Sequence, residues 1–172
     1  MEFKEIVQRR RSIRKFTDEP VTDEQVKTIL RAALMAPTGH SKRAWKFVVV
    51  NDRAQLQQLS KCKQAGGEFL AEAAVAVVVA YDTAATDVWI EDAAIAAVTM
   101  QYQATELGLG SCWSQIRLRT DENGTPATDN ISRQLGLDEQ AEVLCVIGIG
   151  HPAIERKMQD EDKLAWDSVT FA

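Results

Sequence analysis

The sequence predicts an α+β fold in which a mixed, largely antiparallel sheet of four strands carries helices on both faces. Four short apolar runs, separated by turns and helical segments, predict the strands. One run, Ala73 to Ala80, is apolar on both faces, as a strand is when both sides of its sheet are covered. A segment from Asp87 to Leu107 is alanine-rich nearly all round, which is typical of a buried central helix.

Two helices are predicted before the first strand. Glu2 to Arg9 forms a short helix that ends in a cluster of basic residues. Thr22 and Gln25 form a capping box, and apolar residues follow at helical spacing. The Ala36-Pro37 pair ends this second helix, because the residue before a proline disfavours helical geometry. A polar loop, Thr38 to Arg43, follows.

The middle of the chain alternates strands with helices. Trp45 to Asn51 predicts the first strand, and Asp52 to Ser60 predicts a surface helix. After the second strand and the alanine-rich helix, the Gly108–Gly110 segment stops the helix. Ser111 to Arg117 then predicts the third strand.

The chain ends in a polar tail. Thr128 to Leu135 predicts a short helix, Val143 to Ile149 the fourth strand, and polar residues follow Pro152. The apolar residues of this tail need a surface to pack on: Leu164, Trp166, Val169 and Phe171. They could cover a neighbouring subunit or fold back on their own domain. We therefore expect one domain over residues 1–172, with a core of 1–152 and a C-terminal arm of 153–172.

Composition excludes several classes of protein. The formal net charge of -5 argues against nucleic acid and against a membrane surface as the main partner. The N-terminus is charged rather than apolar, and no apolar run is long enough to span a bilayer. Three cysteines lie far apart, so we expect reduced thiols and a cytoplasmic protein.

The basic cluster is the main candidate for a binding site. Four arginines and one lysine surround Ser12 within seven residues, in a chain that is otherwise acidic. Arginine binds phosphate through two parallel hydrogen bonds, so the cluster predicts an anion site. A solvated basic turn is the alternative, and spacing alone does not decide between them.

The common catalytic motifs are missing. There is no phosphate loop, no HExxH and no G-x-S-x-G elbow, so we expect no bound metal and no catalytic nucleophile. Gly148 to Ala153 fits a dinucleotide fingerprint, but too little chain follows it to build that fold. An anion site without reactive side chains is typical of proteins that take their chemistry from a cofactor.

Four segments resemble, in order and spacing, the motifs of the FMN-dependent nitroreductase family in its short form of about this length. The family motifs are R-x-S-x-[RK]-x-[FY] followed by Pro-Val, an A-P-[ST] loop running into a W-x-F strand, a helix ending in G-L-G-x-x-W, and an I-G-x-G-x-P turn. The matching segments are Arg10 to Phe16 with Pro20-Val21, Ala36 to Phe47, Trp89 to Trp113, and Ile147 to Pro152.

The resemblance implies roles for the basic cluster. Arg10 and Ser12 would hold the FMN phosphate and ribityl chain, with Arg11 nearby. Arg14 would reach the pyrimidine edge of the flavin, where a fixed cation stabilises the charge gained on reduction. Lys163 in the arm would be a second phosphate cation, with Lys157 as the alternative.

The resemblance also places two further segments against the flavin. Trp113, Ser114 and Gln115 would lie along the ring, with a backbone N–H offered to the flavin N5 atom. The partner subunit would contribute residues of the polar loop: Pro37, Thr38, Gly39 and Ser41. The family thus implies a homodimer with two FMN sites at its interface and an exchanged C-terminal arm.

The implied activity is ping-pong hydride transfer through flavin N5. NADH or NADPH would reduce the flavin, and a nitroaromatic or quinone acceptor would then take its place. This chain has Ser41 where many relatives have Asn, and Arg43-Ala44 where many have Gln-Pro, which leaves the acceptor open. A non-catalytic FMN-binding protein, used for storage or sensing, is the alternative, and a nucleic-acid-binding domain is the third hypothesis.

Overall fold

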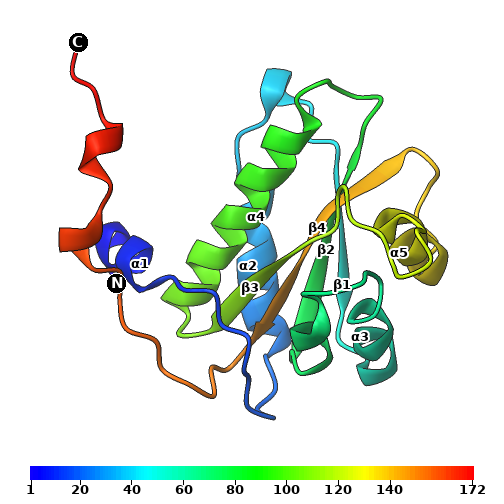
Figure 1. The fold of residues 1–172 in the computed structure, drawn as a ribbon, viewed down its shortest axis with the longest axis horizontal. Helices are drawn as coiled ribbons and strands as arrows, with labels where there is room; N and C mark the ends of the chain where they lie inside the picture. The colour runs from blue at the N-terminus through cyan, green and yellow to red at the C-terminus, as the bar shows by residue number, and fades with distance from the viewer.

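The structure is a computed structural model that describes residues 1–172 and contains one four-stranded sheet flanked by helices (Figure 1). The strands are β1 (Trp45–Val50), β2 (Val75–Asp82), β3 (Gly110–Gln115) and β4 (Ala141–Gly150). The α-helices are α1 (Phe3–Arg9), α2 (Asp23–Leu34), α3 (Arg53–Leu59), α4 (Trp89–Glu106) and α5 (Ala127–Leu135). Four single turns of 3₁₀ helix are η1 (Gly39–Ser41), η2 (Glu68–Ala71), η3 (Glu161–Lys163) and η4 (Trp166–Ser168).

The strand order is β1-β2-β4-β3, so β1 and β3 are the two edges of the sheet. All three strand pairings are antiparallel. The parallel element of the predicted mixed sheet is a single bridge between Ser12 and Ser111, which places the N-terminal segment beside β3. An edge strand has unpaired main-chain groups, so the open side of β3 is available to a ligand.

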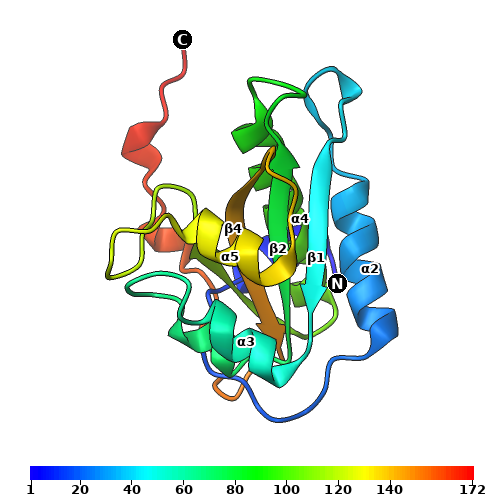
Figure 2. The same cartoon turned by 90° about the vertical axis from the view of Figure 1, so that its right-hand side faces the viewer.

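Helices cover both faces of the sheet, which confirms the predicted α+β fold. Val75, Val77 and Val79 of β2 pack into a cluster with α2 and α4. The alternate residues, Ala76 and Val78, pack into a second cluster with α3, η2 and α5. Figure 2 shows α3 and α5 in front of the sheet and α2 at its side. The alternation follows from the two-residue period of a strand.

The capping box predicted at the start of the second helix is confirmed. Thr22 Oγ1 accepts a hydrogen bond from the Gln25 N–H at 3.2 Å, and the Gln25 side chain accepts from the Thr22 N–H at 2.9 Å. The third strand is shorter than predicted. The N–H groups of Ile116 and Arg117 both donate to the Leu144 carbonyl at 3.1 Å, so the chain turns away from β4 after Gln115.

The C-terminal arm leaves the core (Figure 1). It first passes α1, where the Gln159 N–H donates to the Gln8 carbonyl at 2.8 Å. Beyond that point the apolar residues of the arm remain uncovered, and Trp166 and Phe171 are 65% and 90% exposed. Within one chain the arm therefore does not fold back over its own core. No helix has both the length and the apolar character that crossing a bilayer requires.

Candidate functional site

The basic segment lies along the open edge of β3. Ser12 forms the bridge to Ser111, and the Ile13 N–H donates to the Ser111 carbonyl at 3.0 Å. The segment can come this close because Gly110 has no side chain. A Cβ there would lie 2.8 Å from Ile13 Cβ, closer than real Cβ atoms approach. The absence of a side chain at Gly110, at the start of β3, therefore lets the basic segment pack directly against the strand.

A second glycine, Gly150, allows close packing at the C-terminal end of the basic segment. Phe16 packs against Gly150, where a Cβ would lie 2.8 Å from the Phe16 ring. The Thr17 N–H donates to the His151 carbonyl at 2.9 Å, and Phe16 bridges Pro152. The turn at the end of β4 therefore fixes the basic segment and starts the arm from the same place.

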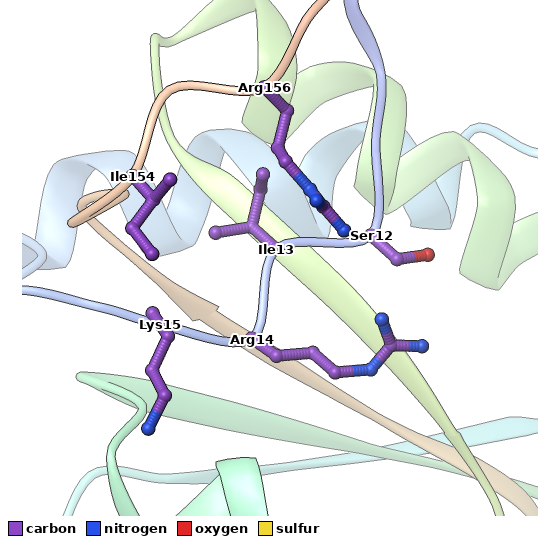
Figure 3. Close-up of a pocket in the computed structure, with 6 residues that line it drawn as sticks. All are labelled: Ser12, Ile13, Arg14, Lys15, Ile154 and Arg156. Carbon is purple, nitrogen blue, oxygen red and sulfur yellow. The ribbon is translucent and has the colours of Figure 1, made fainter.

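A small pocket of about 190 Å³ opens beside this segment (Figure 3). The Ser12 hydroxyl and the Arg14 guanidinium point to the same side, and Arg156 reaches from the arm toward Ser12 (Figure 3). Lys15 points away from them and pairs with Glu72 at 3.0 Å. The six lining residues are Ser12, Ile13, Arg14, Lys15, Ile154 and Arg156.

Three arginines of the basic segment and the arm have no carboxylate partner, and two of them, Arg14 and Arg156, line this pocket. Arg10, Arg14 and Arg156 take part in no ion pair, whereas Arg9 pairs with Glu5 at 2.9 Å. Arg14 and Arg10 both lie near the buried Cys112 thiol. Burial raises the pKa of that thiol, and these two cations lower it in part. Uncompensated positive charge beside a serine hydroxyl has the chemistry that a phosphate group requires, so the residues present fit such a group.

Lys63 adds a cation that the sequence analysis missed. Its side chain is buried, with 8% of the residue exposed, and its Nζ donates to the Gln115 carbonyl at 2.9 Å. Burial lowers the pKa of this ammonium. No carboxylate lies within ion-pair distance. This lysine has no distinctive sequence signal, because its partner is 52 positions away.

The main chain of β3 faces the same open edge. Because strand residues alternate in direction, and the Ser111 carbonyl faces the basic segment, the main-chain groups of Trp113 and Gln115 point outward as well. The side chains are already engaged. The Trp113 indole donates to Gln115 Oε1 at 2.9 Å, and Gln115 Nε2 donates to the Arg117 carbonyl at 3.0 Å. What the strand offers a ligand is therefore its backbone N–H groups.

Ser114, between them, is buried and belongs to the other face. Its hydroxyl lies 3.5 Å from the Gly66 carbonyl, in the loop that carries Lys63. This contact joins β3 to the Lys63 loop. The structure therefore brings together, in one chain, the basic segment, the predicted β3 residues and Lys63.

The polar loop lies elsewhere. Pro37, Thr38, Gly39 and Ser41 precede β1, which is the opposite edge of the sheet from β3. Figure 1 shows η1 at one end of α4, away from the N-terminal segment. One chain therefore does not bring the loop to the basic segment. That the loop serves the site of a partner subunit stays a prediction.

Within one chain, neither Lys163 nor Lys157 lies beside Ser12, and their role as phosphate cations stays a prediction. Lys163 pairs with Asp160 at 3.1 Å, and neither Lys163 nor Lys157 lines the pocket beside Ser12. The Lys157 carbonyl instead accepts from the Arg11 guanidinium at 2.9 Å, so Arg11 ties the arm to the core. The residue that the arm places at the pocket is Arg156. The sequence showed a basic Arg156-Lys157 pair, but not which member turns inward.

Fold and site together define an α+β protein with an anion-binding sheet edge. The model of the nitroreductase family matches residues 7–66 and 53–151 of this chain. A curated relative from Archaeoglobus fulgidus, named as an NADH dehydrogenase/NAD(P)H nitroreductase, is 31% identical over 157 residues, which are 89% of this chain and 87% of the relative. The chain belongs to the nitroreductase family.

Solved structures agree with this family. An FMN-dependent nitroreductase from Clostridium difficile aligns with a TM-score of 0.94 at 43% identity, over 96% of each chain. A protein from Desulfovibrio desulfuricans, solved in complex with FMN, aligns with a TM-score of 0.80 at 25% identity, over 100% of this chain and 97% of that chain.

Proposed function

We propose that this protein is an FMN-dependent oxidoreductase that uses NADH or NADPH to reduce planar acceptors such as nitroaromatics and quinones. The observation that carries the proposal is the open edge of β3. There, cations without carboxylate partners and outward backbone N–H groups lie side by side. A ligand that matches both features carries a phosphate, which binds the cations, and a planar ring, which accepts hydrogen bonds from the backbone N–H groups.

Each residue has a role in this proposal. Arg10, Ser12 and Arg156 bind the phosphate through charge-assisted hydrogen bonds. Arg14 and Lys63 supply positive potential beside the ring. When bound, FMN supplies the hydride chemistry, taking a hydride from the nicotinamide and passing it to an acceptor, in ping-pong fashion.

The proposal includes a homodimer in which the exposed arm covers the partner. The pocket of about 190 Å³ is smaller than the roughly 300–1,000 Å³ of typical cofactor sites. One chain thus offers a partial site, and its polar loop lies at the far edge of the sheet. A second copy that contributes its loop would enlarge the site, and the uncovered Trp166 and Phe171 would gain a surface.

The first experiment is a visible spectrum of the purified protein, followed by addition of NADH or NADPH. We expect flavin absorbance that is released on heating as FMN and that bleaches with the nicotinamide without air. A yellow protein that neither nicotinamide bleaches would instead be a storage or sensor protein. A protein that takes up no FMN would contradict the proposal as a whole.

The second experiment tests the phosphate residues. The double variant Arg10→Ala with Ser12→Ala should bind FMN at least about a hundredfold more weakly, since it loses two or more hydrogen bonds to a charged group. Arg9→Ala with Thr17→Ala is the matched control, because it removes an arginine that is paired with Glu5 and a hydroxyl, neither of which lines the pocket. Equal affinities of the two variants would show that the phosphate assignment is wrong.

A further inference from the structure

The polar loop that precedes β1 has an unusual backbone. His40, Ser41 and Arg43 have φ angles of 51°, 54° and 49°, all in the left-handed region. Residues with side chains rarely adopt this conformation, and the strain persists only where surrounding structure imposes it. Three such residues within four positions therefore require something that holds the loop.

One hydrogen bond joins this loop to the rest of the protein. The Gly39 N–H donates to Asp92 Oδ1 at 2.8 Å, whereas Thr38 bonds within the loop, to the Arg43 N–H at 3.2 Å. No other hydrogen bond or ion pair links residues 37–43 to another part of the chain. Gly39 also packs tightly, since a Cβ there would lie 2.6 Å from Val88 Cγ2.

Asp92 is itself built into the core. The residue is 2% exposed, and Tyr81 Oη donates to its second oxygen, Oδ2, at 2.8 Å. Tyr81 is fully buried, and burial together with the Asp92 hydrogen bond raises its pKa, so the phenol stays a donor. The carboxylate thus links β2, the first turn of α4 and the loop. A buried carboxylate is costly unless it is hydrogen-bonded, and these two hydrogen bonds to Asp92 offset that cost.

We infer that Asp92, oriented by Tyr81, is the positioning residue for the strained loop, and through the loop it sets how the protein recognises the nicotinamide and the acceptor. His40, Ser41 and Arg43 of this loop are exposed. The inference rests on the proposed function, in which this loop completes the flavin site of the partner subunit. It adds that the geometry of that site depends on a carboxylate with no contact to substrate or cofactor.

The test compares four variants of the FMN-loaded protein. Asp92→Ala removes the acceptor for Gly39. Asp92→Asn keeps an oxygen for Gly39 and is the conservative rescue. Tyr81→Phe keeps the carboxylate but releases its orientation. Glu91→Ala is the matched control, because it removes an exposed carboxylate from the same helical turn.

Steady-state kinetics are measured per bound flavin, with NADH, NADPH and a planar quinone. For Asp92→Ala we expect KM to rise about tenfold for both the nicotinamide and the quinone, with kcat changed less than about twofold. Tyr81→Phe should shift KM in the same direction by about threefold, and Asp92→Asn and Glu91→Ala should remain near the wild type. A lower yield of folded protein would not change KM, so a purely structural role predicts unchanged KM values.

Amide hydrogen exchange of the FMN-free protein supplies a readout that does not depend on activity. We expect faster exchange at Gly39–Ser41 in Asp92→Ala, with no change in β4. Unchanged exchange would overturn the positioning role, and faster exchange with unchanged KM would overturn the role in recognition. If Asp92→Ala does not fold, Tyr81→Phe decides by the same criteria. A wild-type protein that binds no FMN would instead show that the proposed function has failed.

Discussion

At the scale of single residues, the cations near Ser12 differ in whether a carboxylate neutralises them. Lys15 and Lys163 are paired with Glu72 and Asp160, whereas Arg14 and Arg156 are free of such partners. A paired cation has less attraction left for an added anion. The absence of a carboxylate partner, rather than the number of basic residues, therefore identifies which cations can bind phosphate.

The first prediction concerns the arm cation. Arg156→Ala should weaken FMN binding by about tenfold, the effect of one charge-assisted hydrogen bond. Lys163→Ala removes the same charge seven residues further along the arm, and should leave the affinity within about twofold. Titration of the FMN-free protein by flavin fluorescence measures both. If both substitutions weakened FMN binding equally, Lys163 would also have to be assigned to the phosphate site.

A second residue-scale prediction concerns Cys62. Burial raises its pKa from 9.0 to about 11. In the unfolded chain the thiol loses its proton first as the pH rises, so the stability that the neutral thiol contributes is complete below pH 9. It is lost progressively as the pH rises towards 11. Two pKa units correspond to about 2–3 kcal/mol.

Urea unfolding under reducing conditions checks this at several pH values between 8 and 11. Cys62→Ala should be less stable at pH 8, because it leaves a cavity, but its stability should fall less steeply above pH 9. The difference between the two chains removes the contribution of groups that they share. Parallel curves for wild type and variant would contradict the assignment.

At the scale of secondary-structure elements, β3 combines two properties. It is an edge strand, so its outward main-chain groups are not used by the sheet. It also begins at Gly110, which lets the basic segment approach to within contact distance. The proposed cofactor site therefore combines the open edge of β3 with the basic segment that packs against it, and Lys63 lies near the Gln115 end of the strand.

The third prediction tests whether Gly110 positions the basic segment on β3. Gly110→Ala should push Ile13 away from β3 and weaken FMN binding by about tenfold, because Ser12 and Arg14 move with it. Gly124→Ala is the control. Gly124 has a φ of +82° and no atom within 4 Å of an added Cβ, so the change strains the backbone without displacing the segment. Thermal unfolding measures the loss of stability and FMN titration measures the loss of affinity. An unchanged FMN affinity for Gly110→Ala would contradict the proposal that Gly110 positions the basic segment.

At the scale of the whole molecule, one chain leaves two things unfinished. The arm carries large apolar side chains into solvent, and the polar loop lies at the opposite sheet edge from the basic segment. A second copy resolves both in the proposed dimer. The fourth prediction is that Trp166→Ala with Phe171→Ala weakens dimerisation by at least about tenfold, since large aromatic anchors dominate such interfaces.

Sedimentation over a range of protein concentrations measures this effect. The unfolding temperature of the diluted chain should change little, because both side chains are exposed within one chain. Asp167→Ala, between the two aromatics, is the control and should leave the dimer intact. A double variant that remains dimeric at the lowest concentration would show that the arm is not the interface.

The sequence by itself determined the elements and the family. Apolar runs and the Thr22–Gln25 capping box depend on neighbours in the chain, and four ordered motifs indicated the flavin-binding family. It also singled out the Arg9–Lys15 segment, because five basic residues near one hydroxyl are visible without a fold.

Only the tertiary structure decided how these parts meet. Lys63 reaches Gln115 across 52 positions, and Asp92 lies buried between Tyr81 and Gly39. Within one chain, the path of the arm places Arg156, and not Lys163, beside Ser12. Such contacts depend on strand order and on burial, which arise from packing between distant segments and leave no periodic signal along the chain.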